Sequence, residues 1–151
     1  MSNLSLTGQF VRLSPYDEYN NYFIHFNTKL KNIHTELVIQ SMTNEQVLGY
    51  IYSYDYNKID DYLFMGIDFN DDYNSSIILE ACNIFFNYIF TCFPIRKIYY
   101  EGSSYNMKIM KDFKEIGFKL EANLKKDYFF NGDYCDKYIL ALYSKDFSKG
   151  Y

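Results

Sequence analysis

Residues 75–94 read SSIILEACNIFFNYIFTCFP and are followed at 97–100 by KIYY, and these two segments decide the fold. The first is apolar for most of its length, but Glu80, Asn83 and Asn87 recur at helical spacing along one edge. That stripe predicts a helix buried on nearly all sides within a protein, rather than a membrane span. Pro94 ends the helix, and KIYY predicts a short buried strand.

The segments before this helix predict a first strand, a helix and a three-strand meander. Strands are expected at 9–13, 36–42, 47–56 and 62–69. Between the first two, Tyr19, Tyr22, Phe23 and Phe26 recur at helical spacing, and Ser14-Pro15 precedes them as a helix-start signal. Only about twenty residues are available there, so we expect one helix.

The segments after KIYY predict a second helix and a closing hairpin. Ser103 or Ser104 is expected to cap the helix, and Gly117 to follow its last turn. Strands at 120–130 and 134–143 flank Asn131-Gly132, a strong signal for a type I′ hairpin turn. The predicted order is β-α-β-β-β-α-β-α-β-β in one domain over residues 1–151. It implies an α/β fold with a mixed, mostly antiparallel sheet flanked by helices on both faces.

Composition excludes several classes of function. The net charge of −4 argues against a nucleic-acid partner. The three cysteines are widely spaced and His25 and His34 are isolated, so neither a disulfide framework nor a metal site is expected. The N-terminal MSNLSLTGQF lacks the basic and apolar regions of a secretion signal. We therefore expect a cytoplasmic protein without a membrane association.

Three stretches in this order resemble the GNAT superfamily of N-acetyltransferases, specifically the branch that acetylates ribosomal-protein N-termini. Asn106 is followed eleven residues on by Gly117-Phe118, as in the family. The hairpin NGDYCD at 131–136, continued by YILALY at 138–143, is similar to that branch's C-terminal signature. The segment YNSSIILEA at 73–81 takes the place of the family's Gly-x-Gly loop and following Glu-Ala.

The resemblance implies a site for acetyl-CoA or another acyl-CoA and no metal. In the family, the Gly-rich loop and the next helix N-terminus bind the CoA pyrophosphate, which here implies Asn74, Ser75, Ser76 and Ile77. The third meander strand and the Asn of the later motif contact the pantetheine arm. The corresponding residues here are Ile67, Asp68, Phe69 and Asn106.

Two departures from the family pattern affect this site. Asn74 and Ser76 replace both loop glycines, and Asp71-Asp72 precede them, so CoA binding is expected to be weakened or altered. The two replacements are either defects of a decayed site or contacts of a repurposed one. Phe113 stands where many members have a tyrosine that protonates the departing thiolate. It is assigned to the cofactor site by resemblance, with a core position as the alternative.

Substitute catalytic groups are expected near the same cleft. Asp68, or less favourably Asp61, is the candidate base for the amine proton, and Tyr105, with Ser104 as the alternative, is the candidate acid.

These residues predict an acyl-CoA-dependent N-acyltransferase, most simply an N-acetyltransferase, acting on an amine of a small molecule or peptide. Two alternatives remain open: a non-catalytic binding or regulatory protein with the same fold, and an acyltransferase whose donor is bound to a carrier protein. The aromatic-rich hairpin and the short N-terminal region also predict a homodimer.

Overall fold

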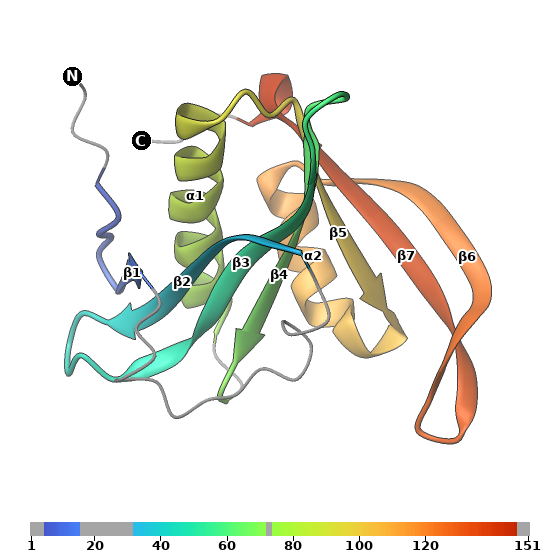
Figure 1. Ribbon diagram of the computed structural model, residues 1–151. Coiled ribbons are helices and arrows are strands. Elements are labelled where there is room, and N and C mark those ends of the chain that lie inside the picture. Colours follow the sequence, from blue (N-terminus) through green and yellow to red (C-terminus); the bar gives the residue numbers. More distant parts are fainter. Residues whose placement is uncertain (1–4, 16–31, 72–73, 148–151) are drawn as a thin grey trace.

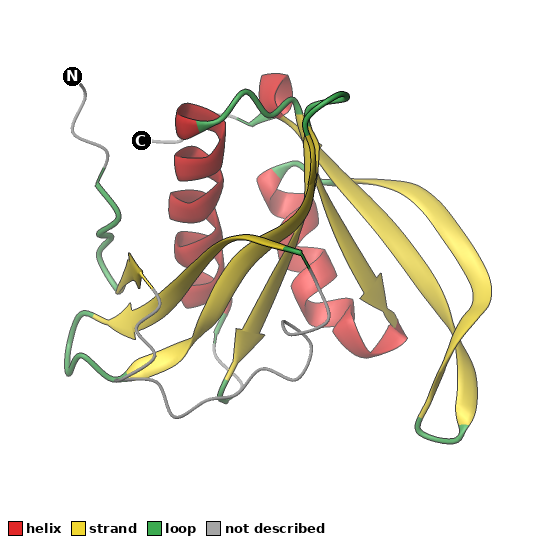
Figure 2. Ribbon diagram, viewed as in Figure 1, coloured by secondary structure: helices red, strands yellow, loops and turns green. Residues whose placement is uncertain are grey.

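In a computed structural model, which describes residues 5–15, 32–71 and 74–147, the chain forms one twisted seven-stranded sheet with two α-helices (Figures 1 and 2). The elements follow the predicted order wherever the chain is described. They are β1 (Val11–Pro15), β2 (Ile33–Ser41), β3 (Val47–Asn57), β4 (Tyr62–Phe69), α1 (Ser75–Cys92), β5 (Lys97–Ser103), α2 (Met107–Ile116), β6 (Lys119–Phe130) and β7 (Asp133–Tyr143). The described part of the chain also contains two 3₁₀ turns, at Ser104–Asn106 and Ser144–Asp146.

The sheet is mixed and mostly antiparallel, as predicted. Its strand order is β1-β2-β3-β4-β5-β7-β6, and only β4 and β5 pair in parallel. The right-handed β4-α1-β5 unit that such a parallel pair requires supplies the crossover. β1 extends through Pro15 and β2 begins at Ile33, so both bounds differ from those predicted. The helix predicted from Tyr19 to Phe26 lies outside the described residues.

Local signals set several element ends. Asn131 and Gly132 both have positive φ, of 52° and 85°, as the type I′ turn between β6 and β7 requires. Gly117 follows α2 with φ 128°, and its N–H returns to the carbonyl of Phe113. Ser103, one of the two caps predicted for α2, instead caps the 3₁₀ turn at Ser104–Asn106, where its hydroxyl accepts a hydrogen bond from the Tyr105 N–H at 3.2 Å. The N-cap of α2 is Asn106.

Both described helices belong to one hydrophobic core. α1 contacts β1 and β3, α2 contacts β5, and the two helices contact each other. α1 is long and apolar enough to cross a membrane by length and composition alone. It lies instead in the core, with Phe85, Phe86 and Ile89 completely buried against the sheet.

Glu80 on α1 fastens the loop before β1. Its carboxylate accepts hydrogen bonds from three consecutive backbone N–H groups, those of Gln9, Phe10 and Val11, at 2.6, 2.7 and 2.8 Å. A Cβ at Gly8 would overlap this carboxylate, so the loop can approach Glu80 only with glycine there.

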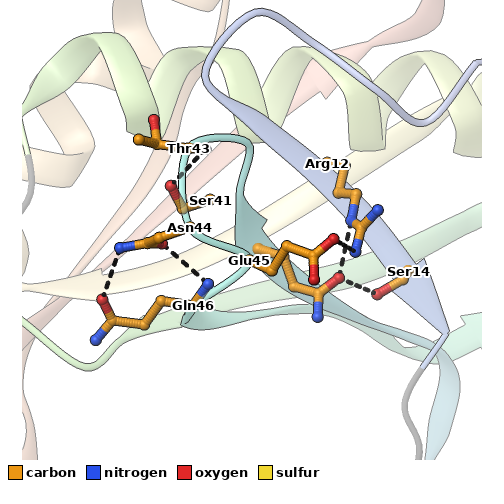
Figure 3. A network of polar contacts seen from close by, with 8 residues as sticks. Arg12, Ser14, Ser41, Thr43, Asn44, Glu45 and Gln46 are labelled. Carbon is orange, nitrogen blue, oxygen red and sulfur yellow. Dashed lines mark hydrogen bonds and ion pairs between the residues drawn. The ribbon is translucent and has the colours of Figure 1, made fainter.

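A polar network joins β1 to the neighbouring strand β2 (Figure 3). The Arg12 guanidinium donates to Gln40 Oε1 at 3.0 Å, and the Ser14 hydroxyl donates to the same oxygen at 3.2 Å. Arg12 also reaches Glu45 in the β2–β3 turn at 3.5 Å. Because the Arg12–Glu45 pair is exposed, it contributes little stability and mainly orders the sheet edge.

Candidate functional site

The candidate site lies where β4 and β5 separate. The two strands pair only from Tyr62–Lys97 to Met65–Tyr100. Beyond that point β4 continues to Phe69 and β5 to Ser103 without pairing to each other. Figure 1 shows the arrowheads of β4 and β5 diverging, with the first turns of α1 and α2 at the same end of the sheet. Beyond Met65, the edge of β4 that faces β5 is therefore not hydrogen-bonded to β5.

A cavity of about 380 Å³ occupies this opening. The structure brings five of the predicted site residues together around it: Ile67, Asp68, Phe69, Tyr105 and Asn106. Four other described residues line it as well: Asp71, Ile78, Lys108 and Ile109. The cavity is thus walled by the end of β4 and by the N-terminal turns of both helices.

Asn74 caps α1, and none of the predicted residues Asn74, Ser75, Ser76 and Ile77 is among the described residues that line this cavity. The Asn74 side-chain oxygen accepts a hydrogen bond from the Ile77 N–H at 3.1 Å. Its backbone is extended, with φ −72° and ψ 161°, so the position imposes no left-handed strain on a non-glycine residue. The amides of Ser75 and Ser76, in the first turn, lack partners within the helix and suit an anion. Asn74 itself satisfies the third amide, which leaves fewer donors for a phosphate.

Asn106 is held by a reciprocal capping arrangement with Ser103. Its side-chain oxygen accepts hydrogen bonds from both the N–H and the hydroxyl of Ser103, each at 3.0 Å. This fixes the turn between β5 and α2. Asn106 lines the 380 Å³ cavity and also a second cavity of about 250 Å³ on the hairpin side. Asn106 therefore lies between the 380 Å³ cavity and the 250 Å³ cavity.

The second cavity was not foreseen from the sequence. Its lining comes from the end of β5 and from the hairpin: Glu101, Gly102, Ser103, Asn106, Tyr128 and Lys137. Lys137 is engaged by Asp127 at 2.9 Å, which raises the pKa of the lysine. Glu101 lies close enough to Tyr54 to help raise the pKa of that phenol, although burial is the larger cause.

Tyr105 is a half-exposed phenol at the cavity mouth. Its ring packs edge-on against Phe130 of the hairpin, with centroids 4.8 Å apart. Partial desolvation raises the pKa of Tyr105, and the nearby Cys135 thiol, which hydrogen-bonds to it, raises it further. The phenol consequently keeps its proton at neutral pH, as a general acid must.

Asp68 is paired with a tyrosine of the adjacent strand. Tyr52 lies opposite Gly66 in the β3–β4 register, and a Cβ at Gly66 would overlap the Tyr52 ring. The glycine lets the ring lie across β4, where the Tyr52 hydroxyl hydrogen-bonds to Asp68. Burial, followed by the charge of Asp68, raises the pKa of Tyr52, so this hydroxyl acts as a donor.

Phe113 does not line the cavity, and its assignment to the cofactor site is wrong. Its side chain is completely buried and packs against Tyr100 and Phe118, at centroid distances of 4.6 and 4.9 Å. The alternative of a core position is confirmed. Asp61, the alternative base, lies in the β3–β4 turn at the far end of β4, where its carbonyl accepts from the Arg96 N–H at 2.8 Å.

Lys108 is the main cavity residue that the sequence reading missed. The loop before α1 contains no base, but Lys108 enters from the first turn of α2, two residues after Asn106. Its position two residues after Asn106 is the sequence signal that could have identified Lys108 as a cavity residue. Asp71 and Asp68 line the same cavity, so its electrostatic character is mixed. Among residues 5–15, 32–71 and 74–147, no cluster of His, Cys, Asp and Glu could hold a metal ion.

No family model and no curated protein sequence matches this chain. Solved structures do match it. Spermidine N-acetyltransferase from Vibrio cholerae, in complex with CoA and spermine, superposes with a TM-score of 0.76 at 16% identity over 90% of this chain and 96% of that one. The N-terminal domain of ribosomal-protein-alanine acetyltransferase from Clostridium acetobutylicum gives 0.65 at 16% identity, over 93% and 96%.

A GNAT-family acetyltransferase from Bacillus anthracis also matches, with a TM-score of 0.65 at 20% identity over 73% of this chain and 66% of that one. These identities are low, so the likeness is one of architecture. The chain has the fold of the GNAT N-acetyltransferases, as its sequence predicted.

Proposed function

We propose that this protein transfers an acyl group, most simply acetyl, from an acyl-CoA to an amine of a small molecule or peptide. The observation that carries the proposal is the cavity at the β4–β5 separation, walled by two helix N-termini and adjoining a second cavity at Asn106. A donor on one side and an acceptor on the other would meet there without a covalent enzyme intermediate.

The donor side has the features that a pantetheine thioester needs. The edge of β4 from Gly66 to Phe69, which does not pair with β5, can hydrogen-bond to the amides of the pantetheine arm. The first-turn amides at Ser75 and Ser76 can bind a phosphate. Asp71 repels that phosphate, and Asn74 already uses one amide, so the expected affinity for CoA is modest.

The acceptor side favours a cationic amine. Glu101 places a carboxylate in the 250 Å³ cavity, and Tyr128 adds an aromatic ring that suits an ammonium group. Lys137 also lines this cavity, but Asp127 pairs with its ammonium group at 2.9 Å. The Vibrio cholerae protein was solved with spermine, a polyamine. A small amine of this charge class is therefore the first acceptor to test.

The chemistry requires one proton acceptor and one proton donor. The neutral amine attacks the thioester carbonyl, a C–N bond forms and the C–S bond breaks. Asp68 accepts the amine proton directly or through water, and Tyr105 gives its proton to the departing thiolate. Asn106 stabilises the developing oxyanion or positions the pantetheine amide with its side-chain nitrogen.

We also propose that the protein forms a homodimer. Phe129, Phe130 and Tyr134 at the hairpin tip are all more than half exposed, an apolar surface that an isologous contact would cover. Sedimentation equilibrium at micromolar concentration tests this, and a monomer mass near 18.1 kDa would refute it. The cytoplasmic location expected from the N-terminal sequence also remains a proposal.

The direct test is a transfer assay. Wild-type protein is incubated with acetyl-CoA and a panel of polyamines, amino acids and peptides, while thiol release and product mass are recorded together. Acetylated product in proportion to released thiol supports the proposal. Donor binding without any transfer would favour the non-catalytic alternative.

A further inference from the structure

A groove between α2 and strands β6 and β7 is larger than both cavities of the candidate site. Its volume is about 630 Å³. Five apolar side chains and three lysines line it: Met107, Met110, Leu120, Tyr138, Leu140, Lys108, Lys111 and Lys114. Met107 and Leu120 are 56% and 50% exposed. Two methionines make such a surface adaptable to a partner's shape.

The charge along this groove is opposite to that of the whole chain. The protein carries −4 overall, yet among the described residues three lysines and no acidic residue line the groove. Lys111 and Lys114 form no ion pair with any described residue. Lys111 and Lys114 are three residues apart, about 4.5 Å along the helix at 1.5 Å per residue. Carboxylates about one turn apart on a partner helix would match this spacing.

The groove adjoins the 380 Å³ cavity at the β4–β5 separation, because Lys108 lines both. That cavity is called the donor cavity below. The donor cavity is poorly suited to the several phosphates of CoA: Asn74 occupies the Ile77 amide, and Asp71 lines the wall. A phosphopantetheine arm attached to a protein carries a single phosphodiester. It would need only the two first-turn amides at Ser75 and Ser76.

We propose that the groove docks the acidic helix of an acyl carrier protein, which delivers its acyl-phosphopantetheine into the donor cavity. This inference rests on the proposed acyltransferase function and names its preferred donor. The reaction is unchanged: the amine nitrogen bonds to the acyl carbon and gives its proton to Asp68, the C–S bond breaks, and Tyr105 protonates the carrier's departing thiolate. Acyl-CoA is then the weaker donor, because it lacks the protein surface that the lysines bind.

The test compares three donors on the full-length protein: a type II acyl carrier protein carrying acetyl-phosphopantetheine, acetyl-CoA, and acetyl-pantetheine. Binding of the fluorescently labelled carrier is measured by anisotropy, and transfer by kcat/KM. The groove variant is Lys111→Glu with Lys114→Glu, and Lys111→Gln with Lys114→Gln is the milder version. The matched control is Lys58→Glu with Lys145→Glu, which changes the net charge equally at exposed positions in the β3–β4 turn and the last 3₁₀ turn that do not line the groove.

We expect the wild type to prefer the carrier donor over acetyl-CoA. The groove variant should lose about tenfold or more in carrier affinity and in kcat/KM with the acyl carrier, because charge reversal opposes docking. Its kcat/KM with acetyl-pantetheine should stay within about twofold, since that donor has no protein surface to lose. The carrier affinity of the Lys111→Gln, Lys114→Gln variant should lie between those of the wild type and the charge-reversed variant. The control variant should bind the carrier as tightly as the wild type.

Three results would overturn the carrier proposal. The wild type could use acetyl-CoA while failing to bind the carrier, which leaves the proposed transferase intact. The groove and control variants could lose carrier affinity equally, which would make the effect one of net charge. The groove variant could change the sedimenting mass without changing carrier binding, which would make the groove a contact between copies of this chain. Failure with all three donors would instead contradict the proposed function itself.

Discussion

The Tyr52 hydroxyl hydrogen-bonds to the Asp68 carboxylate at the point where β4 leaves β5, and Gly66 provides the space for the tyrosine ring. A carboxylate held by a phenol at the edge of the donor cavity is oriented before any substrate arrives. This pair therefore gives Asp68 a fixed direction in which to accept a proton.

Asp68→Asn should lower kcat about 10²-fold or more, because general-base catalysis typically contributes 10² to 10⁴. Tyr52→Phe should lower kcat less, since the base remains and only its orientation is loosened. Transfer kinetics with saturating donor measure both. Asp61→Asn, a carboxylate at the opposite end of β4, is the matched control and should leave kcat unchanged. Equal loss in Asp61→Asn and Asp68→Asn would remove Asp68 from the mechanism.

Tyr105→Phe should lower kcat by about tenfold to a hundredfold across neutral pH, because the thiolate must then leave without a positioned acid. The raised pKa of Tyr105 places the loss of its proton above the ordinary value for tyrosine. Activity that depends on this proton falls only as the pH rises through that raised pKa, so the wild type should show no such decline between pH 7 and about 9.5. A kcat profile that is identical in the variant would contradict the assignment.

Asn74→Gly combined with Ser76→Gly should tighten acetyl-CoA binding. The change removes the Asn74 side chain from the Ile77 N–H and returns that amide to a phosphate. Replacing the cap by glycine should destabilise the helix by only a few tenths of a kcal/mol, and glycine at Ser76 by about 0.5–1 kcal/mol. Isothermal titration calorimetry shows whether the affinity for acetyl-CoA rises or falls. Weaker binding would mean that Asn74 and Ser76 contact the ligand themselves.

Glu80→Gln should destabilise the protein by about 1–3 kcal/mol, because the amide replaces charge-assisted hydrogen bonds to three N–H groups and presents donors to donors. Urea unfolding of the variant measures the loss. Glu115→Gln on the exposed surface of α2 is the control and should lie within about 0.5 kcal/mol of the wild type. Equal stability of all three proteins would show that the loop before β1 adds nothing to folding.

The fold could be predicted because its determinants are local. Pro94 ends α1, Gly117 ends α2, and Asn131-Gly132 closes the hairpin, each through the backbone conformation of one or two residues. The approximate order of elements followed from these signals. The hydrogen bonds of Glu80 to residues 9–11 were not predictable, because they join positions about 70 apart and leave no trace in local periodicity.

The site was only partly predictable. Ile67, Asp68 and Asn106 could be placed because they occupy family positions on regular elements. The role of Asn74 as a cap for its own helix depends on side-chain rotation, which spacing does not reveal. The position of Lys108 and the groove between α2, β6 and β7 both result from how α2 packs beside the hairpin, which is a property of tertiary structure.

The central claim is that the cavity between β4 and β5 binds an acyl-pantetheine donor. Isothermal titration of the wild type with acetyl-CoA at low ionic strength tests it most directly, with Asn106→Ala as the cavity variant. We predict measurable binding that is weakened in Asn106→Ala, because that residue lines the cavity and fixes the turn beside it. No heat and no thermal shift at millimolar acetyl-CoA, with acetyl-pantetheine and the acyl carrier equally inert, would contradict it.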